Sequence, residues 1–515
     1  MNSTLPCKIS CRLSSKPVRI LILGLLLTAW PAGAQIPESY QAFKDSLTLF
    51  SGLTSPTERT TRLNAFWNRL KAANRIPFAV GNQVAFMYKG AGSSSTAIAG
   101  DFNGWSPSGT AWQGKKVTNL DLHLVETTFP PDARLDYKWV IGGSNWILDP
   151  ANPFTQMSGF GDNSELRMPN WNVSPWLVRT PGIATGKLSA NIRFTSQKLG
   201  YVSQYRVYTP AGYDTLQTLS VLYVTDGHEY SADATGSLII ILDNLIAARL
   251  IEPLIVVFLD PRNPDNTSQN RRMNEYNLNK AFLDYVCDEL VPVIDAAYRT
   301  AATADTRGIL GTSMGGLNSA YFGAKRHDVF RRIAIQSPAF QANSTIYSLY
   351  ATDRMPLKIF LSTGLIGDTQ NQAETLLNTY LIPKDYEHVY KAVNEGHSWG
   401  NWRALNDDVL IYLFPPSKPV SVPESEKPVK TGGVFNYPNP FNPSTRIGFY
   451  LSQPSAVSLR VYDSTGREVI TEQYGLMSAG QQSVPVMLGG FASGIYPYRL
   501  LAGEVSMTGR MTLLR

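Results

Sequence analysis

The motif Gly311-x-Ser313-x-Gly315 constrains the fold of this 515-residue chain more than any other feature of its sequence. An apolar pair at residues 309–310 leads into the motif, and a helix-compatible run at residues 317–325 follows it. A strand, a sharp turn and a helix in this order project the serine hydroxyl free of a sheet, and the glycines let strand and helix cross closely. The motif therefore predicts a nucleophilic serine at Ser313. The alternative is a glycine-rich helix start at which Ser313 is only an N-cap.

Five histidines are present to supply the base that such a serine requires. His397 lies in a loop just after a strand-like stretch at residues 386–390, and it comes last in the chain order serine, acid, histidine. It is therefore the predicted base, with an ordinary surface-loop histidine as the alternative. His228 is expected to line the mouth of the site. The remaining three are assigned to strands or to a helix end: His123, His327 and His388.

The acid that orients the histidine should follow the apolar strand predicted at residues 356–363. Asp368 is the preferred candidate, because a carboxylate in that loop would orient the imidazole and stabilise its charged form. Glu374 is the second candidate, although it falls a turn into the helix predicted at residues 372–380. Asp368 also has a structural alternative, as the cap or the N-terminal charge of that helix.

Two backbone N–H groups are needed to hold an oxyanion in a site of this kind. Met314, the residue after the nucleophile, is predicted to supply one of them. The other is expected from the loop after the apolar strand at residues 219–225, at Gly227 or His228. The sequence does not choose between these two amides.

Residues from about 185 to 415 resemble the esterase family that includes enterochelin esterases and carbohydrate esterases with feruloyl and acetyl-xylan activity. The segments that carry the resemblance are 221–227, 311–316, 337–340, 364–368 and 396–403. The resemblance implies an α/β-hydrolase fold, a Ser–Asp–His triad, and neither a metal nor another cofactor. It also implies substrate-binding roles near the site for Arg272, Glu275 and Trp399. A surface ion pair is the alternative interpretation of Arg272 and Glu275.

The triad implies a serine esterase that forms an acyl-enzyme on Ser313. By resemblance, its substrates are small-molecule or polysaccharide esters, with acyl or phenolic-acid esters of carbohydrates preferred. An enterochelin-type siderophore esterase is the first alternative. A non-catalytic glycan-binding surface protein on a hydrolase scaffold is the alternative from another functional class.

The first 34 residues have the form of a secretory signal peptide. Four basic residues precede an apolar run at residues 20–30, and Ala32-Gly33-Ala34 offers a cleavage site. The run is too short for a transmembrane helix, and no later stretch is long and apolar enough to span a bilayer. Cleavage would change the balance of basic to acidic residues from 46 against 40 to 42 against 40. Nothing in this charge balance indicates nucleic-acid binding.

Two regions separate the signal peptide from the esterase region at residues 180–415. Residues 35–80 are predicted to be helical, with a break at Ser55-Pro56. Residues 82–175 carry short, punctuated strand patterns that indicate an Ig-like β-sandwich.

The predicted sandwich resembles glycogen-recognising carbohydrate-binding modules and the N-terminal domain of enterochelin-type esterases. The resemblance lies in residues 100–105, 137–139 and 146–150. It implies that Trp105, Lys138 and Trp146 bind sugar, since aromatic faces suit the apolar face of a pyranose. The alternative is a structural sandwich whose tryptophans pack against the hydrolase.

The C-terminal part contains a predicted linker, residues 416–434, and a strand-rich module, residues 435–515. The module opens on the segment 437–445, which contains Asn-Pro-Phe-Asn-Pro, and alternating patterns predict strands at residues 446–451, 457–462, 493–500 and 508–515. It resembles the C-terminal sorting domain of the type IX secretion system, which implies contact with that machinery and a secreted or surface-attached protein. A plain accessory sandwich is the alternative. The predicted fold class is thus an α/β-hydrolase domain flanked by two all-β Ig-like sandwiches.

Overall fold

The computed structural model describes residues 36–416 and 434–513, apart from residues 93, 160, 438, 440, 442, 452, 464, 465, 478, 479 and 504. The chain forms two compact units, Met1–Ser417 and Lys418–Arg515. The predicted signal peptide at residues 1–34 and nearly all of the predicted linker at residues 416–434 lie outside the described residues. Within the described ranges, no helix is both long and apolar enough to cross a membrane.

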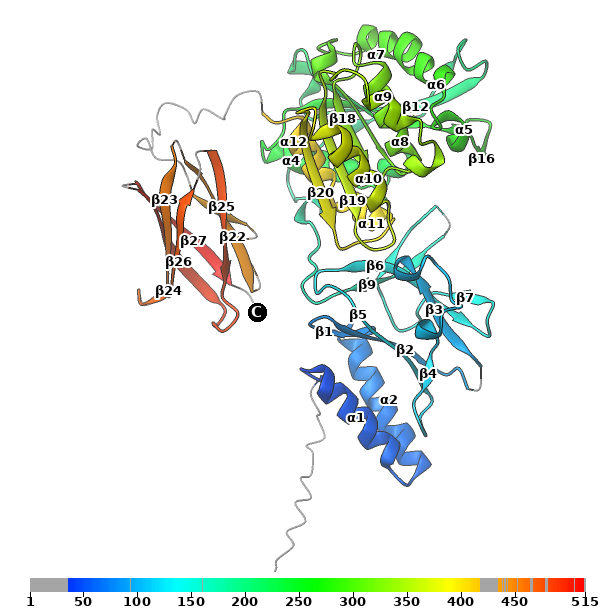
Figure 1. Cartoon of the computed structure of the whole chain (residues 1–515), viewed down its shortest axis with the longest axis vertical. Helices are drawn as coiled ribbons and strands as arrows, with labels where there is room; N and C mark the ends of the chain where they lie inside the picture. The colour runs from blue at the N-terminus through cyan, green and yellow to red at the C-terminus, as the bar shows by residue number, and fades with distance from the viewer. Residues whose placement is uncertain are drawn as a thin grey trace, which may run out of the picture. The chain divides into compact units, whose positions relative to one another are not determined.

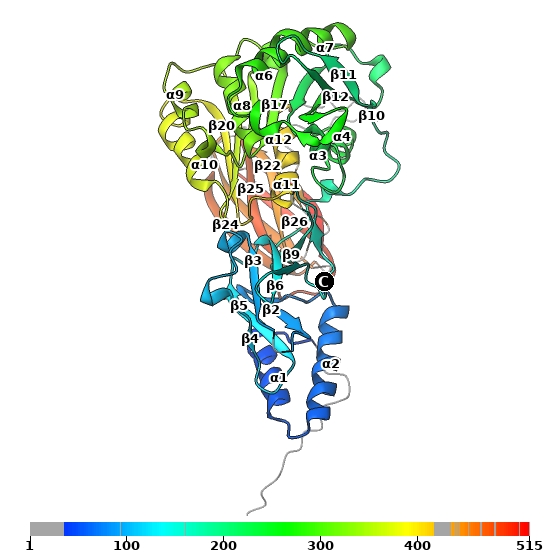
Figure 2. The ribbon, with the colours of Figure 1, turned by 90° about the vertical axis from the view of Figure 1, so that its right-hand side faces the viewer.

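Two helices begin the first unit, α1 (Tyr40–Gly52) and α2 (Pro56–Ala72), and they lie side by side (Figures 1 and 2). The predicted break at residues 55–56 is confirmed. Ser55 accepts a hydrogen bond from the Glu58 amide and Pro56 occupies the first turn, a favourable helix start.

The β-sandwich consists of two antiparallel sheets. The first contains β1 (Phe78–Val80), β2 (Gln83–Lys89), β5 (Leu122–Thr128) and β4 (Lys115–Lys116) in that order. The second contains β3 (Thr96–Gly100), β6 (Arg134–Ile141), β9 (Asn163–Arg167) and β8 (Thr155–Gln156), with β7 (Asn145–Ile147) paired to β6. Along β2, Val84 and Phe86 face the core between the sheets, whereas Ala85 and Met87 pack against the two helices. Strand alternation therefore buries both faces of the first sheet.

The esterase region is built on a nine-stranded sheet. Its path is β10 (Lys187–Leu188), β12 (Val202–Thr209), β14 (Leu254–Asp260), β13 (Ser220–Val224), β17 (Arg307–Thr312), β18 (Arg332–Gln336), β19 (Lys358–Gly364) and β20 (Glu387–Val393), and β11 (Ile192–Thr195) pairs with β12. The strands from β14 to β20 are parallel, and β12 joins them antiparallel. Because parallel strands end at the same edge, the loops after β13, β17, β19 and β20 meet there.

Helices cover both faces of this sheet (Figure 1). One layer contains α6 (Lys280–Asp284), α7 (Val291–Ala297), α8 (Met314–Lys325), α9 (Ile346–Tyr350) and α10 (Gln370–Leu376), with π-helical turns at Tyr285–Leu290 and Leu377–Leu381. The other contains α4 (Leu238–Ala247), α11 (Trp399–Ala404) and α12 (Asn406–Leu413). Short elements complete the edge of the site: α3 (Gly227–Tyr230), α5 (Arg272–Glu275), β15 (Arg262–Asn263) and β16 (Asn266–Asn270).

The second unit consists of two sheets around its own apolar core. One contains β21 (Phe435–Tyr437), β22 (Ser444–Leu451) and β25 (Gly480–Met487), and the other contains β24 (Glu468–Met477), β23 (Ser455–Tyr462), β26 (Gly494–Ala502) and β27 (Val505–Leu513). The strands expected at residues 446–451, 457–462, 493–500 and 508–515 match β22, β23, β26 and most of β27, but β24 and β25 were not predicted. The side chains of β24 are mostly exposed, so it lacks the alternating apolar pattern of a half-buried strand.

Candidate active site

Ser313 occupies the sharp turn between β17 and α8. Its backbone lies at φ 58° and ψ −117°, a conformation that costs a non-glycine residue roughly 1–3 kcal/mol. Strand and helix cross closely, since a Cβ atom added to Gly311 would lie 2.3 Å from the carbonyl oxygen of Gly315. The serine side chain caps no helix amide, so the N-cap interpretation is wrong. Its hydroxyl is free to take part in chemistry at the edge of the sheet.

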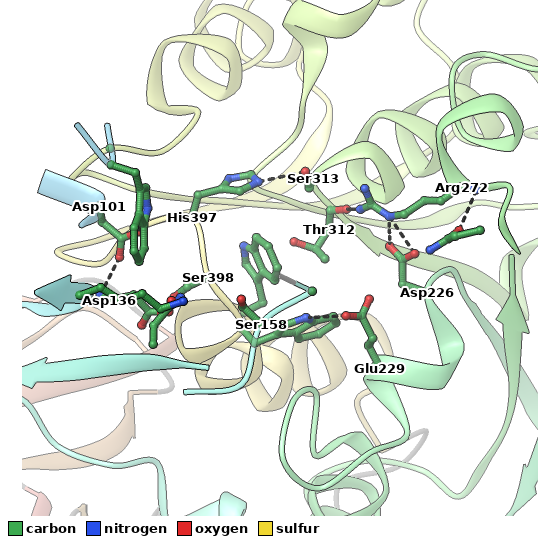
Figure 3. Close-up of a pocket in the computed structure, with 18 of the residues that line it drawn as sticks. Asp101, Asp136, Ser158, Asp226, Glu229, Arg272, Thr312, Ser313, His397 and Ser398 are labelled. Carbon is green, nitrogen blue, oxygen red and sulfur yellow. Dashed lines mark hydrogen bonds and ion pairs between the residues drawn. The ribbon is translucent and has the colours of Figure 1, made fainter. Parts of the chain in front are cut away.

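His397 lies between the serine and an acid, in the loop that joins β20 to α11. Its Nε2 atom is 2.9 Å from Ser313 Oγ, and its Nδ1 atom is 2.6 Å from Oδ1 of Asp368 (Figure 3 shows the serine contact). The ring of Trp402 meets the imidazole edge-on, with 5.0 Å between the ring centroids. The predicted serine and histidine are therefore in direct contact.

Asp368 lies in the loop after β19, and its side chain is fully buried. Its Oδ2 atom accepts hydrogen bonds from the Ser337 hydroxyl, at 2.6 Å, and from the Gly364 amide. Trp402 in turn donates its indole N–H to Ser337 Oγ at 2.9 Å, which fixes that hydroxyl. Burial alone would raise the pKa of Asp368, but hydrogen bonding to His397 and the charge of its imidazolium, together with Ser337, hold the pKa below its usual range. The carboxylate is thus kept ionised beside the imidazole.

Glu374, the second acid candidate, is turned away from the histidine. It lies on α10 and accepts hydrogen bonds from Gln370 Nε2 at 2.9 Å and from the Tyr390 hydroxyl at 3.4 Å. The geometry therefore favours Asp368 as the partner of His397.

The three predicted oxyanion donors lie at the starts of two helices. Met314 is the first residue of α8, whereas Gly227 and His228 begin α3 directly after β13. Within the described residues, the amides of these three residues donate to no backbone or side-chain acceptor. The His228 ring lies 3.5 Å from Asp260 through Nδ1, and burial lowers its pKa. Both loops thus present free amides beside the serine, and the choice between Gly227 and His228 stays open.

The predicted pair of Arg272 and Glu275 is divided between two environments on α5. Arg272 Nε donates to both carboxylate oxygens of Asp226, at 2.8 and 2.9 Å, and Nη2 donates to the Thr312 carbonyl at 3.1 Å. Glu275 is 1% exposed and accepts a hydrogen bond from the Tyr201 hydroxyl at 2.7 Å. The surface ion pair is therefore wrong. Arg272 joins the predicted oxyanion loop, through Asp226, to the residue before Ser313, whereas Glu275 is buried against Tyr201.

A cavity of about 820 Å³ opens beside Ser313 and His397. Both the sandwich and the esterase region line it, and Figure 3 shows Asp101 and Asp136 on the side opposite Arg272. The three residues predicted to bind sugar, Trp105, Lys138 and Trp146, line this same cavity rather than a separate surface. The cavity is also lined by Ser158, Glu229, Met273, Ser398, Trp399 and Trp402.

Glu229 is a cavity residue that no sequence motif identified. Its Oε1 atom accepts a hydrogen bond from the indole N–H of Trp399 at 3.3 Å. Burial, with the charge of Asp226, raises the pKa of Glu229 to about 7. Its position two residues after Gly227, in the predicted oxyanion loop, was the available signal.

We expect Glu229 to make substrate binding depend on pH. A neutral ester that excludes water should raise the pKa of Glu229 further, because desolvation disfavours the carboxylate. The KM for a neutral ester should therefore rise above pH 7, by up to about tenfold if that pKa rises by one unit on binding. KM measured from pH 6 to 9 should show this rise in the wild type and not in Glu229→Gln. Glu275→Gln, which changes a buried glutamate outside the cavity lining, should retain the rise.

Comparison with known proteins identifies two parts of the chain. Residues 196–412 match the family described as "Putative esterase". These residues form an esterase domain of that family. The chain is accordingly a carboxylic ester hydrolase. Residues 436–513 match the "Secretion system C-terminal sorting domain", which indicates export followed by secretion or surface attachment.

Individual relatives cover different parts of the chain. The endo-1,4-beta-xylanase/feruloyl esterase of Xylanibacter ruminicola is 30% identical over 147 residues, which are 27% of this chain and 20% of that protein. The uncharacterized protein YjcH of Bacillus subtilis is 23% identical over 41% of this chain and 92% of its own length. The enterobactin esterase of Shigella flexneri, solved in the presence of enterobactin, is 19% identical over 64% of this chain and 92% of its own, with a TM-score of 0.54. This last likeness supports the esterase-type hydrolase fold.

Proposed function

We propose that the chain is an exported serine esterase in which Ser313, His397 and Asp368 act as a catalytic triad. The observation that carries the proposal is the unbroken line of contacts from Ser313 Oγ through His397 to the buried Asp368 carboxylate. The chain order of these residues and the strained turn at the serine support the same assignment.

The proposed reaction proceeds through an acyl-enzyme. Ser313 Oγ attacks the ester carbonyl while His397 Nε2 takes the hydroxyl proton, and Asp368 stabilises the imidazolium. The amide of Met314 and that of Gly227 or His228 hold the oxyanion. The intermediate then collapses, and His397 gives its proton to the departing alcohol. A water deprotonated by His397 attacks the acyl-enzyme, and Ser313 is released with the free acid.

The preferred substrates are acyl or phenolic-acid esters of carbohydrates. The cavity has aromatic walls at Trp105 and Trp146, with Lys138 as a hydrogen-bond donor, and these groups suit sugar or phenolic rings with hydroxyls. The Xylanibacter ruminicola relative is named a xylanase/feruloyl esterase, which supports this substrate class. An enterobactin-type trilactone is the alternative, and the sorting domain argues against it if such esters are cleaved inside the cell.

A panel of aryl acetate, acetyl-sugar and feruloyl-sugar esters tests the substrate class. We expect the highest kcat/KM for an ester that carries a sugar or a phenolic ring. A panel in which only a siderophore trilactone is cleaved efficiently would support the alternative.

The sandwich tryptophans are predicted to bind substrate inside the catalytic cavity. Replacing Trp105 or Trp146 by alanine should raise KM for a sugar ester roughly tenfold, about 1.4 kcal/mol of lost stacking, and should change kcat little. KM for a small aryl acetate should change less. Trp112→Ala is the control, because this sandwich tryptophan packs on Phe102 outside the cavity. Equal KM values for the sugar ester in all variants would show that the sandwich is only structural.

The C-terminal sorting domain is predicted to act in export and not in hydrolysis. It has its own core, and the proposed catalytic residues all belong to the first unit. Deletion after Pro416 should leave kcat and KM of the purified enzyme within about twofold of the full chain. In the native host the truncated protein should accumulate in the periplasm. Its normal appearance outside the cell would refute the sorting role.

A further inference from the structure

The loop that carries His397 leaves the esterase sheet and joins the β-sandwich. At the end of β20, the Asn394 carbonyl accepts a hydrogen bond from the Arg134 amide at 3.2 Å, and Arg134 and Glu395 form a parallel bridge. Asn394 also donates its side-chain amide to Asp132 at 2.8 Å. The indole N–H of Trp171 reaches Glu395 at 3.1 Å. The sandwich therefore binds both residues that precede Gly396, and the esterase region adds a hydrogen bond from the Ile366 amide to the Glu395 carbonyl at 3.3 Å.

The Arg134 side chain also holds the loop at the residue that follows His397. Its guanidinium is fully buried, and Nη1 donates to the hydroxyl of Ser398, the residue after His397, at 2.9 Å. The remaining donors bind Asp136, at 2.7 Å, and Glu165, and Nη1 lies 3.7 Å from Glu395. Arginine presents a rigid planar fork, so three carboxylates and one hydroxyl fix its orientation. Asp136 and Ser398 lie on the same side of the cavity in Figure 3.

Glycines let the sandwich approach the loops of both His397 and Asp368. A Cβ atom added to Gly396 would lie 2.1 Å from Cγ of Asp101, and one added to Gly367 would lie 1.9 Å from the Asp101 carbonyl oxygen. A Cβ atom on Gly400 would lie 1.9 Å from Cζ of Arg134. Asp101 is 3% exposed, and its Oδ2 atom accepts a hydrogen bond from the Asp136 amide at 2.8 Å. The sandwich therefore packs directly against the residues that precede both partners of Ser313.

The buried charge of Arg134 is paired mainly within the sandwich, by Asp136 and Glu165, and docking adds Glu395 of the esterase region. Burial raises the pKa of Glu395 to about 7, although Arg134 lowers it. Burial lowers the pKa of Arg134, but the surrounding carboxylates more than compensate and hold it above its usual value. A buried Glu395 that lost Arg134 as its neighbour would be unfavourable, so the contact stabilises the docked arrangement of the loop.

We propose that Arg134 is a positioning residue for the esterase reaction: by holding the loop around Ser398 it sets the position of His397, and the β-sandwich is thereby part of the catalytic apparatus. The proposal rests on the proposed role of His397 as the base. Arg134 contacts neither Ser313 nor the imidazole, and it acts through the loop on either side of the histidine. A displacement of this base by about an ångström is enough to slow such a reaction about a hundredfold.

Two substitutions test the proposal, one at the residue that Arg134 binds and one at Arg134 itself. Ser398→Ala removes the hydroxyl that Arg134 binds and leaves every buried charge paired, and Ser398 makes no side-chain capping bond that its loss would remove. Arg134→Lys keeps one positive charge but loses the fork. Arg167→Lys is the matched control, because Arg167 Nη2 binds Glu165 at 2.7 Å from the other side and does not reach Ser398.

The measurements are kcat and KM for an aryl ester, with the thermal midpoint of the full chain. Both test variants should lose about 10- to 100-fold in kcat with KM within about twofold. Their combined loss should be smaller than the product of the single losses, since both break one contact. The control should match the wild type.

A wild-type kcat in Ser398→Ala, at an unchanged thermal midpoint, would overturn the proposal even if Arg134→Lys did not fold. A loss confined to KM would also overturn it, since it would place Ser398 in substrate binding alone. Labelling of the wild-type serine by a fluorophosphonate tests the proposed function separately. Failure to label would refute the triad, whereas labelling with no effect of either variant would refute only the positioning role.

Discussion

Ser313→Ala should lower kcat for every ester substrate by about 10⁴-fold or more while the chain stays folded. In the proposed mechanism this hydroxyl forms the acyl-enzyme, and His397 Nε2 lies 2.9 Å from it. The packing around the turn should stay the same in this variant, because alanine keeps the Cβ atom. Steady-state assays with an aryl ester, alongside a thermal melt, measure both quantities.

Ser319→Ala provides the control for this substitution. Ser319 lies on the same helix, is fully buried, and its hydroxyl has no hydrogen-bond partner among the described residues. Its loss should leave kcat unchanged. A Ser313→Ala variant with activity near that of Ser319→Ala would show that Ser313 is not the nucleophile.

Asp368→Asn should lower kcat by about 10⁴-fold near neutral pH, the second largest effect expected. In the proposed mechanism the carboxylate accepts the Nδ1–H of His397 and stabilises the imidazolium that forms when Ser313 attacks. An asparagine at this position could donate to Nδ1 instead, which would place the imidazole proton on the wrong nitrogen and leave no base at Nε2.

Glu374→Gln is the matched control, because it makes the same carboxylate-to-amide change in the other acid candidate. Glu374 contacts Gln370 and Tyr390 and not the histidine. Its kcat should stay within about twofold of the wild type. A large loss in Glu374→Gln with little loss in Asp368→Asn would reverse the assignment of the acid.

Local motifs predicted the parts of the site that depend on short segments. The glycines on either side of Ser313 predict the sharp turn there. The chain order serine, acid, histidine predicts His397 as the base. The choice of Asp368 over Glu374 depended on where β19 ends and α10 begins, which the apolar pattern indicates only to within a few residues. The free amide of Met314 follows from the helix predicted after Ser313, whereas the helix start at Gly227 was predicted only as a loop.

Contacts between distant segments could not be predicted in the same way. Arg134 and Ser398 are 264 positions apart in the chain, and only Ser398 lies in one of the segments that carry the family resemblance. The sequence of residues 100–105 and 137–146 indicated sugar-binding side chains, but only the docking of the sandwich brings Trp105 and Trp146 to the cavity beside Ser313. The burial of Glu275 against Tyr201 likewise depends on packing and not on a local pattern.

Covalent labelling tests the central claim most directly. The full chain is treated with a fluorophosphonate, digested, and examined by mass spectrometry for the modified peptide. The proposed triad predicts a single adduct on Ser313, formed much more slowly in His397→Ala, because the base that activates the hydroxyl is gone. An adduct on a different serine, or no adduct at all on a chain that still hydrolyses esters, would contradict it.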